Sequence, residues 1–145
     1  MDSSRRRFLG SRKPGLAPCR PPWSSEEAIF VSRCNRCDDC VKACPTRLLA
    51  RGEGGFPFAD FLSAACSFCG ECARVCTTGA IDSRRGADPW KFTIRIGADC
   101  LALRRVECRV CGEACAIGAV RFLPRRGGVA TPDLDASVCT GCGAC

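Results

Sequence analysis

The sequence contains no histidine, and this absence excludes several classes of catalytic site. Without imidazole groups the chain cannot form a Ser-His-Asp triad, an iron site of two histidines and a carboxylate, or a histidine-ligated zinc site. No apolar run approaches the ~18 residues that indicate a membrane-spanning helix, so we expect no transmembrane segment. Because we also find no pair of nucleophile and base, we expect that the protein is not an enzyme.

Lysine is scarce, since only three of the 22 basic residues are lysine and the others are arginine. The formal net charge is +7, and two explanations of the arginine excess remain open: contact with anions or an acidic partner, and a coding bias. The arginine pairs are scattered along the chain, at 84–85, 104–105 and 125–126. Because no aromatic residues are interleaved with them, we expect no nucleic-acid partner.

Cysteine is abundant, with 16 among 145 residues, and without it the apolar share falls from 46% to about 35%. So weak a core in a small protein needs disulfides or metal for stability. Disulfides would require export, and residues 4–9 do match a twin-arginine export motif. Residues 10–22, however, hold four prolines and three charges where an export signal needs an apolar stretch. We therefore interpret residues 1–23 as a basic, proline-rich tail of a cytoplasmic protein whose reduced thiols can bind metal.

Fifteen of the cysteines form four runs, and the sixteenth, Cys19, lies outside them and is expected to be a free thiol. The first two runs have the spacing C-x2-C-x2-C-x3-C, whereas the third begins with C-x7-C. The runs are Cys34, Cys37, Cys40 and Cys44; Cys66, Cys69, Cys72 and Cys76; Cys100, Cys108, Cys111 and Cys115; and Cys139, Cys142 and Cys145. Structural zinc sites use separate C-x2-C pairs, so this spacing favours iron–sulfur clusters.

Runs of this kind work in pairs in ferredoxins with two clusters. Three cysteines of a run hold one [4Fe–4S] cube, and the last cysteine turns away to hold the other cube. The spacing predicts the ligand sets Cys34, Cys37, Cys40 and Cys76 for cluster 1; Cys66, Cys69, Cys72 and Cys44 for cluster 2; Cys100, Cys108 and Cys111 for cluster 3; and Cys139, Cys142, Cys145 and Cys115 for cluster 4. The fourth ligand of cluster 3 should lie four residues beyond Cys145, so we expect that the chain is truncated there.

Short helices and strands are expected around these loops. A capping box formed by Ser24 and Glu27 predicts a helix that leads into the first cysteine run. Turns rich in glycine predict short strands at 56–58 and 129–131. Strict alternation of apolar and polar residues predicts a further strand at 90–96.

The cysteine loops also contain glycines, at positions 70, 112, 141 and 143. We expect these glycines either to let backbone N–H groups approach the clusters or simply to serve the turns. The predicted fold class is α+β, with two tandem bacterial-type 2[4Fe–4S] ferredoxin-like domains. We place the first domain at 24–97 and the second, incomplete one at 98–145. Most of the folding free energy should come from cluster binding, so the iron-free chain should be largely disordered.

Several features together point to a family: the order of the runs, the spacing C-x7-C-x2-C-x3-C, the Ser-Arg-Arg-Arg start and the Arg-Pro-Pro-Trp-Ser segment at 20–24. In these features the chain resembles the NapF family, the ferredoxin-type proteins of the periplasmic nitrate reductase system. It departs from the usual pattern at Thr77 and Ala116, where proline often follows the last cysteine. The resemblance implies a cytoplasmic protein with up to four [4Fe–4S] clusters. It also implies action on the catalytic nitrate reductase subunit before export, in maturation of that subunit's own cluster.

Three functions remain open from the residues alone. The chain could assemble or supply the cluster of a partner enzyme, carry electrons to an oxidoreductase, or serve as an iron–sulfur subunit of a larger complex. Cysteine spacing does not separate these functions, because each of them needs cubes held by thiolates.

Overall fold

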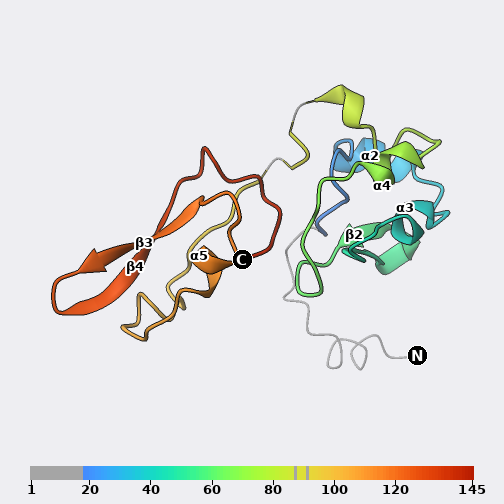
Figure 1. Cartoon of the computed structure of the whole chain (residues 1–145). Helices are drawn as coiled ribbons and strands as arrows, with labels where there is room; N and C mark the ends of the chain where they lie inside the picture. Colours follow the sequence, from blue (N-terminus) through green and yellow to red (C-terminus); the bar gives the residue numbers. More distant parts are fainter. Residues whose placement is uncertain (1–17, 87, 91) are drawn as a thin grey trace, which may run out of the picture.

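The structure, a computed structural model, describes residues 18–86, 88–90 and 92–145. Figure 1 shows two lobes, one from blue to green and one in orange and red, joined by an extended segment. We call residues 18–90 the first half and residues 98–145 the second half. The elements of the first half are α2 (Glu27–Arg33), α3 (Asp39–Lys42), β1 (Leu49–Arg51), η1 (Glu53–Gly55), β2 (Pro57–Ala59), α4 (Glu71–Arg74) and η2 (Ser83–Arg85). Those of the second half are α5 (Val110–Glu113), β3 (Val120–Arg125) and β4 (Gly128–Leu134).

The first half is built on the antiparallel pair β1–β2, in which Leu49 lies opposite Ala59. Helix α3 packs against both β1 and α4. Phe30, on the inner side of α2, is completely buried and belongs to one core with Leu48, Ile81 and Trp90. The core therefore draws on every segment between the cysteine loops of this half.

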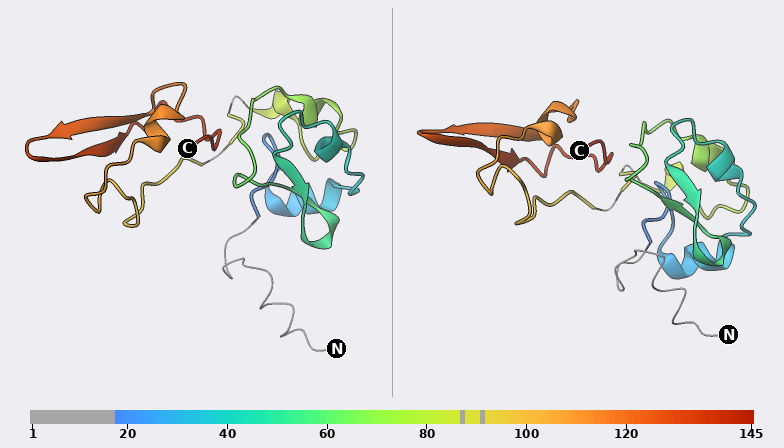
Figure 2. Two further views of the ribbon diagram at one scale, coloured as in Figure 1. Left: turned by 60° about the horizontal axis from the view of Figure 1, so that its bottom comes forward. Right: turned by 90° about the horizontal axis from the view of Figure 1, so that it is seen from below.

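The second half is dominated by the antiparallel hairpin β3–β4, which projects away from the rest of the chain (Figures 1 and 2). Val120 pairs with Leu134 at its base, and the register shifts between Leu123 and Arg125. The strands at 57–59 and 128–134 confirm the two short strands expected after glycine turns. Helix α5 contacts β3, and a Cβ placed on Gly112 would lie 2.9 Å from the Phe122 ring. Gly112 thus makes room for the hairpin.

The predicted strand at 90–96 is wrong. No residue of this segment that the structure describes, namely 90 and 92–96, belongs to a strand. Alternation predicts a strand only where a neighbour offers a second row of hydrogen-bonding groups. Here each hairpin pairs within itself, and the segment runs between the halves instead.

The predicted capping box is also absent, although the predicted helix is present as α2. The helix begins at Glu27 with Glu26 as its N-cap residue, and no side chain caps it. The Glu27 carboxylate instead accepts hydrogen bonds from Arg20 at 2.6 and 2.9 Å. Ser24 lies in a β-bridge with Ile81, so its backbone is not placed to begin the helix.

Residues 18–23, assigned to the tail from the sequence, pack as part of the first half. Pro21 is fully buried, and the backbone N–H of Trp23 donates a hydrogen bond to the Pro89 carbonyl at 2.8 Å. The guanidinium group of Arg20 lies over the rings of Phe30 and Phe56, 5.0 and 5.3 Å from their centroids. We therefore call residues 18–23, which include the Arg-Pro-Pro-Trp segment, the structural strap. The twin-arginine-like motif at 4–9 lies outside the described residues.

Among the residues that the structure describes, no helix is both long enough and apolar enough to cross a lipid bilayer.

Candidate iron–sulfur sites

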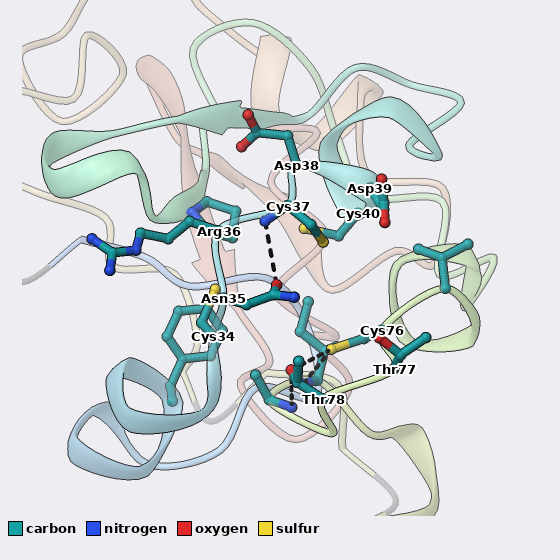
Figure 3. A pocket seen from close by; sticks show the side chains of 15 residues that line it. Cys34, Asn35, Arg36, Cys37, Asp38, Asp39, Cys40, Cys76, Thr77 and Thr78 are labelled. Atoms are coloured by element: carbon teal, nitrogen blue, oxygen red, sulfur yellow. Dashed lines mark hydrogen bonds between the residues drawn. The ribbon is translucent and has the colours of Figure 1, made fainter.

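We number four groups of cysteines as sites 1–4, after the ligand sets predicted above. Site 1 is shown in Figure 3, where the side chains of Cys34, Cys37, Cys40 and Cys76 surround a common cavity. Cys34 caps the C-terminus of α2, Cys40 lies in α3, and Cys76 follows α4. Burial, followed by repulsion from the other three thiolates, raises the pKa of Cys40 to about 12. The four cysteines line this one cavity together.

Site 2 repeats this arrangement with the cross-over reversed. Its cavity is lined by Cys66, Cys69 and Cys72 from the second run and by Cys44 from the first. Cys72 lies in α4 and is buried, and burial followed by repulsion from Cys66 raises its pKa to about 12. Pro22 and Trp23 also line this cavity, so the structural strap forms part of its wall.

Site 4 lies in the second half. Its cavity is lined by Cys139, Cys142 and Cys145 and by Cys115, which follows α5. Sites 1, 2 and 4 each bring four cysteines to the wall of one cavity, which is consistent with one kind of occupant at all three sites.

Site 3 brings together Cys100, Cys108 and Cys111. Burial raises the pKa of Cys111, and the thiolates of Cys100 and Cys108 raise it further. Cys111 lies in α5, and Cys115 of site 4 follows this helix, so site 3 borders site 4. Cys19 stands apart from these groups as a half-buried thiol, whose pKa burial raises to about 11.

The last cysteine of each complete run sits among backbone N–H groups. For Cys44 and Cys76, burial raises the pKa, but backbone N–H groups five, four and two residues further on, together with the hydroxyl of Thr46 or Thr78, outweigh burial, and the pKa is lowered. The pKa of Cys115 is also lowered, chiefly by the N–H of Val120. A lowered pKa favours the thiolate, which is the form that binds metal. The residues four and five positions beyond each of these cysteines are buried: Leu48 and Leu49, Ala80 and Ile81, Ala119 and Val120.

Left-handed backbone flanks the middle cysteine of three runs. The flanking pairs are Arg36 and Asp38, Phe68 and Gly70, and Gly141 and Gly143, with φ between 56° and 80°. Successive N–H groups in such turns converge into a concave nest that binds anions, such as the sulfur atoms of a cluster. Three of these residues, Arg36, Asp38 and Phe68, are neither glycine nor asparagine, so their residue types did not predict the left-handed conformation. Aligning the runs on their middle cysteines would have revealed the repeat.

The acidic pair in the first loop is neutralised. Asp38 binds Arg51 at 2.9 Å, and Asp39 lies 3.7 Å from Lys42. Within the described ranges, no group of three or more Cys, Asp or Glu side chains is arranged to hold a single metal ion.

The donor sets fit a [4Fe–4S] cube better than one ion, because sulfur donors and nests of N–H groups surround cavities. When bound, such a cube accepts or gives up a single electron. The chain supplies the thiolates, the burial and the N–H groups. That the cysteines ligate clusters in these sets stays a prediction.

Comparison with known proteins supports this chemistry. Residues 33–80 match the model of the 4Fe-4S dicluster domain, and this range spans the first two runs. The chain is 47% identical to "Ferredoxin-type protein NapF" of Haemophilus influenzae over 93% of its own length and 76% of the relative. It is 41% identical to the NapF protein of Escherichia coli K12, over the whole chain and 88% of the relative.

A more distant relative is "Methylamine utilization ferredoxin-type protein MauM" of Methylobacillus flagellatus. It is 32% identical over 91% of this chain and 64% of the relative. No solved structure matches the chain significantly.

Proposed function

The chain belongs to the NapF family of ferredoxin-type proteins and carries [4Fe–4S] clusters, and on that premise we propose a specific role for it. It is a cytoplasmic accessory protein, not itself an enzyme, that helps to assemble the iron–sulfur cluster of the catalytic subunit of periplasmic nitrate reductase before export. The family resemblance supplies the partner. What the structure contributes is the access that such a role requires.

One observation supports exchange with a partner. Sites 1 and 2 each present one exposed cysteine, namely Cys37 and Cys69, while their other cysteines are partly or fully buried. Most of the thiols of each site therefore lie inside the protein, and one thiol faces solvent. A bound partner could reach an iron–sulfur cluster from that side without unfolding the protein.

The proposal includes the arrangement of the clusters. Sites 1 and 2 belong to one ferredoxin-like domain and sites 3 and 4 to a second domain in tandem. Support comes from the pattern of crossed runs, because Cys76 lines site 1, Cys44 lines site 2 and Cys115 lines site 4. Each crossed cysteine ties two loops of one half to each other.

The test follows iron between proteins. The full chain is loaded anaerobically with ⁵⁷Fe clusters, mixed with the cluster-free catalytic subunit of periplasmic nitrate reductase, and separated from it again. We expect ⁵⁷Fe to move to the subunit in proportion to the complex formed. The variant Cys19→Ser serves as the control, since Cys19 lies in none of the four sites, and it should transfer as much iron as the parent chain.

A second candidate, an electron carrier, is favoured by the same exposed cysteines. An electron needs only a close approach, whereas donation of iron empties a site. If ⁵⁷Fe stays on the chain, and the chain reduced with dithionite passes its electrons to the cluster-containing subunit, the carrier function replaces the assembly function.

A further inference from the structure

The two halves meet through cysteines of different sites. The backbone N–H of Cys66, in site 2, donates a hydrogen bond to the carbonyl of Cys142, in site 4, at 2.8 Å. A single hydrogen bond therefore separates the backbones of two predicted ligand sets.

An aromatic cluster seats the last cysteine loop on this junction. The Phe61 ring lies 5.4 Å from that of Trp90 and 6.0 Å from that of Phe92, between ring centroids. A Cβ placed on Gly143 would collide with the Phe61 ring. A Cβ placed on Gly141 would lie 3.0 Å from the Phe92 carbonyl oxygen and 3.4 Å from Trp90.

The glycines are required here by close approach and not by backbone conformation alone. At the matching positions of the first run, Arg36 and Asp38 adopt the same left-handed conformation. The fourth run has glycine on both sides of its middle cysteine, and at these two glycines the loop touches the first half. The loop is thus shaped for contact with the first half.

We propose that the loop of residues 139–145 docks on Phe61 and Cys66, and that this junction joins site 2 to site 4 in one electron path through the chain. A single electron that leaves one site is taken up at the next, with no bond or proton changed. Helix α3, which carries Cys40 of site 1, packs against α4, which carries Cys72 of site 2. Cys111 of site 3 lies in α5, and Cys115 of site 4 follows that helix. The order along the electron path is therefore site 1, site 2, site 4, site 3, which differs from the order in sequence.

The inference rests on the proposed ligand sets, and its test separates the two. Gly143→Ala in the full chain, loaded with clusters, pushes the loop away from Phe61. The matched control is Gly127→Ala, because Gly127 also has a positive φ, 64°, but a Cβ there meets open space. Hydrogen exchange of the peptide that contains Cys66 is measured by mass spectrometry. Iron content and the electron paramagnetic resonance spectrum after reduction with dithionite are measured on the same samples.

We expect Gly143→Ala to speed exchange at the Cys66 amide about tenfold, which equals about 1.4 kcal/mol of lost protection. Gly143→Ala should also weaken the magnetic interaction between the clusters of sites 2 and 4. Gly127→Ala should change neither the exchange at Cys66 nor this interaction. Phe61→Ala, which leaves the loop sequence intact, should loosen the junction too. The double variant should be no worse than Phe61→Ala alone, because the collision is then gone.

Two results would overturn the junction. One is wild-type exchange and magnetic coupling in both Gly143→Ala and Phe61→Ala at full iron content. The other is a Cys66 amide that exchanges freely in the loaded parent chain. If instead the parent chain fails to take up iron at sites 2 and 4, the ligand sets are wrong, and the proposed function fails with them. If Gly143→Ala loses iron but Phe61→Ala does not, the exchange and the magnetic interaction measured on Phe61→Ala decide whether the junction exists.

Discussion

In the first half, the buried pairs that follow Cys44 and Cys76 share a core with Phe30 and Trp90, two large aromatic side chains. In the second half, the matching pair follows Cys115, and the other buried side chains are only Ala102 and Ala130. The second half instead exposes large apolar side chains, each at least 46% accessible: Leu101, Leu103, Val106, Val110, Ile117 and Leu123. The same loop geometry is thus supported by a hydrophobic core in the first half and by only a few small buried side chains in the second half.

The cause is the set of elements added to the repeat. The first half gains α2, whose Phe30 lies in the core, and the strap of residues 18–23, in which the Cys19 carbonyl accepts a hydrogen bond from the Ala59 N–H of β2 at 2.7 Å. The second half has no such cover in the part of the chain that the structure describes, and its longer hairpin extends into solvent (Figure 2). In each complete repeat, the buried pair follows a residue with positive φ, which is Arg47, Gly79 or Gly118. Everything beyond that depends on which segments come to pack on it.

Removal of all iron should have the largest effect. Structural metal sites supply on the order of 10 kcal/mol to small domains, more than the net stability of most proteins of this size. We expect the second half to lose all protection from hydrogen exchange, and the first half nearly all. Circular dichroism together with exchange of peptides from each half measures this. A native-like spectrum from rigorously iron-free protein would contradict it.

Loss of a single crossed cysteine should distinguish the halves. Cys76→Ser and Cys115→Ser should each remove about four iron atoms per chain, because each takes one ligand from one cube. The first half should stay compact around Phe30, whereas the second half should unfold. Iron analysis and limited proteolysis are the measurements, with Cys19→Ser as the control that keeps its iron. Equal proteolysis of both halves would show that the core makes no difference.

Truncation of one core leucine should sharpen the contrast. Leu48 is 1% exposed, so Leu48→Ala should cost about 2–5 kcal/mol of unfolding free energy through lost burial and a cavity. Leu123 is 51% exposed, and Leu123→Ala should change stability by less than about 0.5 kcal/mol. Chemical unfolding of the cluster-loaded protein measures both. A large loss from Leu123→Ala would reveal that the hairpin is covered by something in solution.

The smallest effect should come from the ion pair between the strap and α2. Hydrogen bonds from Arg20 lower the pKa of Glu27, although burial opposes this. A lowered pKa adds stability that is present above the ordinary pKa of 4.5 and is lost as the pH falls through the folded value. Because Glu27 is 52% exposed, Glu27→Gln should cost less than about 1 kcal/mol. Unfolding at several pH values from 8 to about 5.5, where the carboxylate stays charged, should show a constant difference from the parent chain.

Much of each loop could be foreseen from the residues, because its geometry depends on spacings of a few residues. The distance between cysteines decides which thiols can reach one cavity, and the thiols around sites 1, 2 and 4 are grouped accordingly. The burial of pairs such as Leu48 and Leu49 follows from the repeated turn before them. The short strands after glycine turns were predictable for the same reason, since a hairpin pairs with itself.

Features that need a distant partner were not predictable from the chain alone. The segment 90–96 alternates like a strand, yet a strand exists only where a second strand satisfies its N–H and C=O groups. The strap at 18–23 looks like a proline-rich tail until Pro89, Phe30 and Phe56 are found against it.

The spacing of the cysteines is enough to indicate the chemistry of this protein, because thiol donors at these intervals favour iron–sulfur clusters. Tertiary structure alone decided which sites are neighbours. The hydrogen bond from Cys66 to Cys142 joins residues that are far apart along the chain, and no local pattern encodes it. The need for glycine at 141 and 143 is seen only in the tertiary structure, where Phe61 and Trp90 leave no room for a Cβ. Contacts of this kind arise from packing, which depends on the whole chain at once.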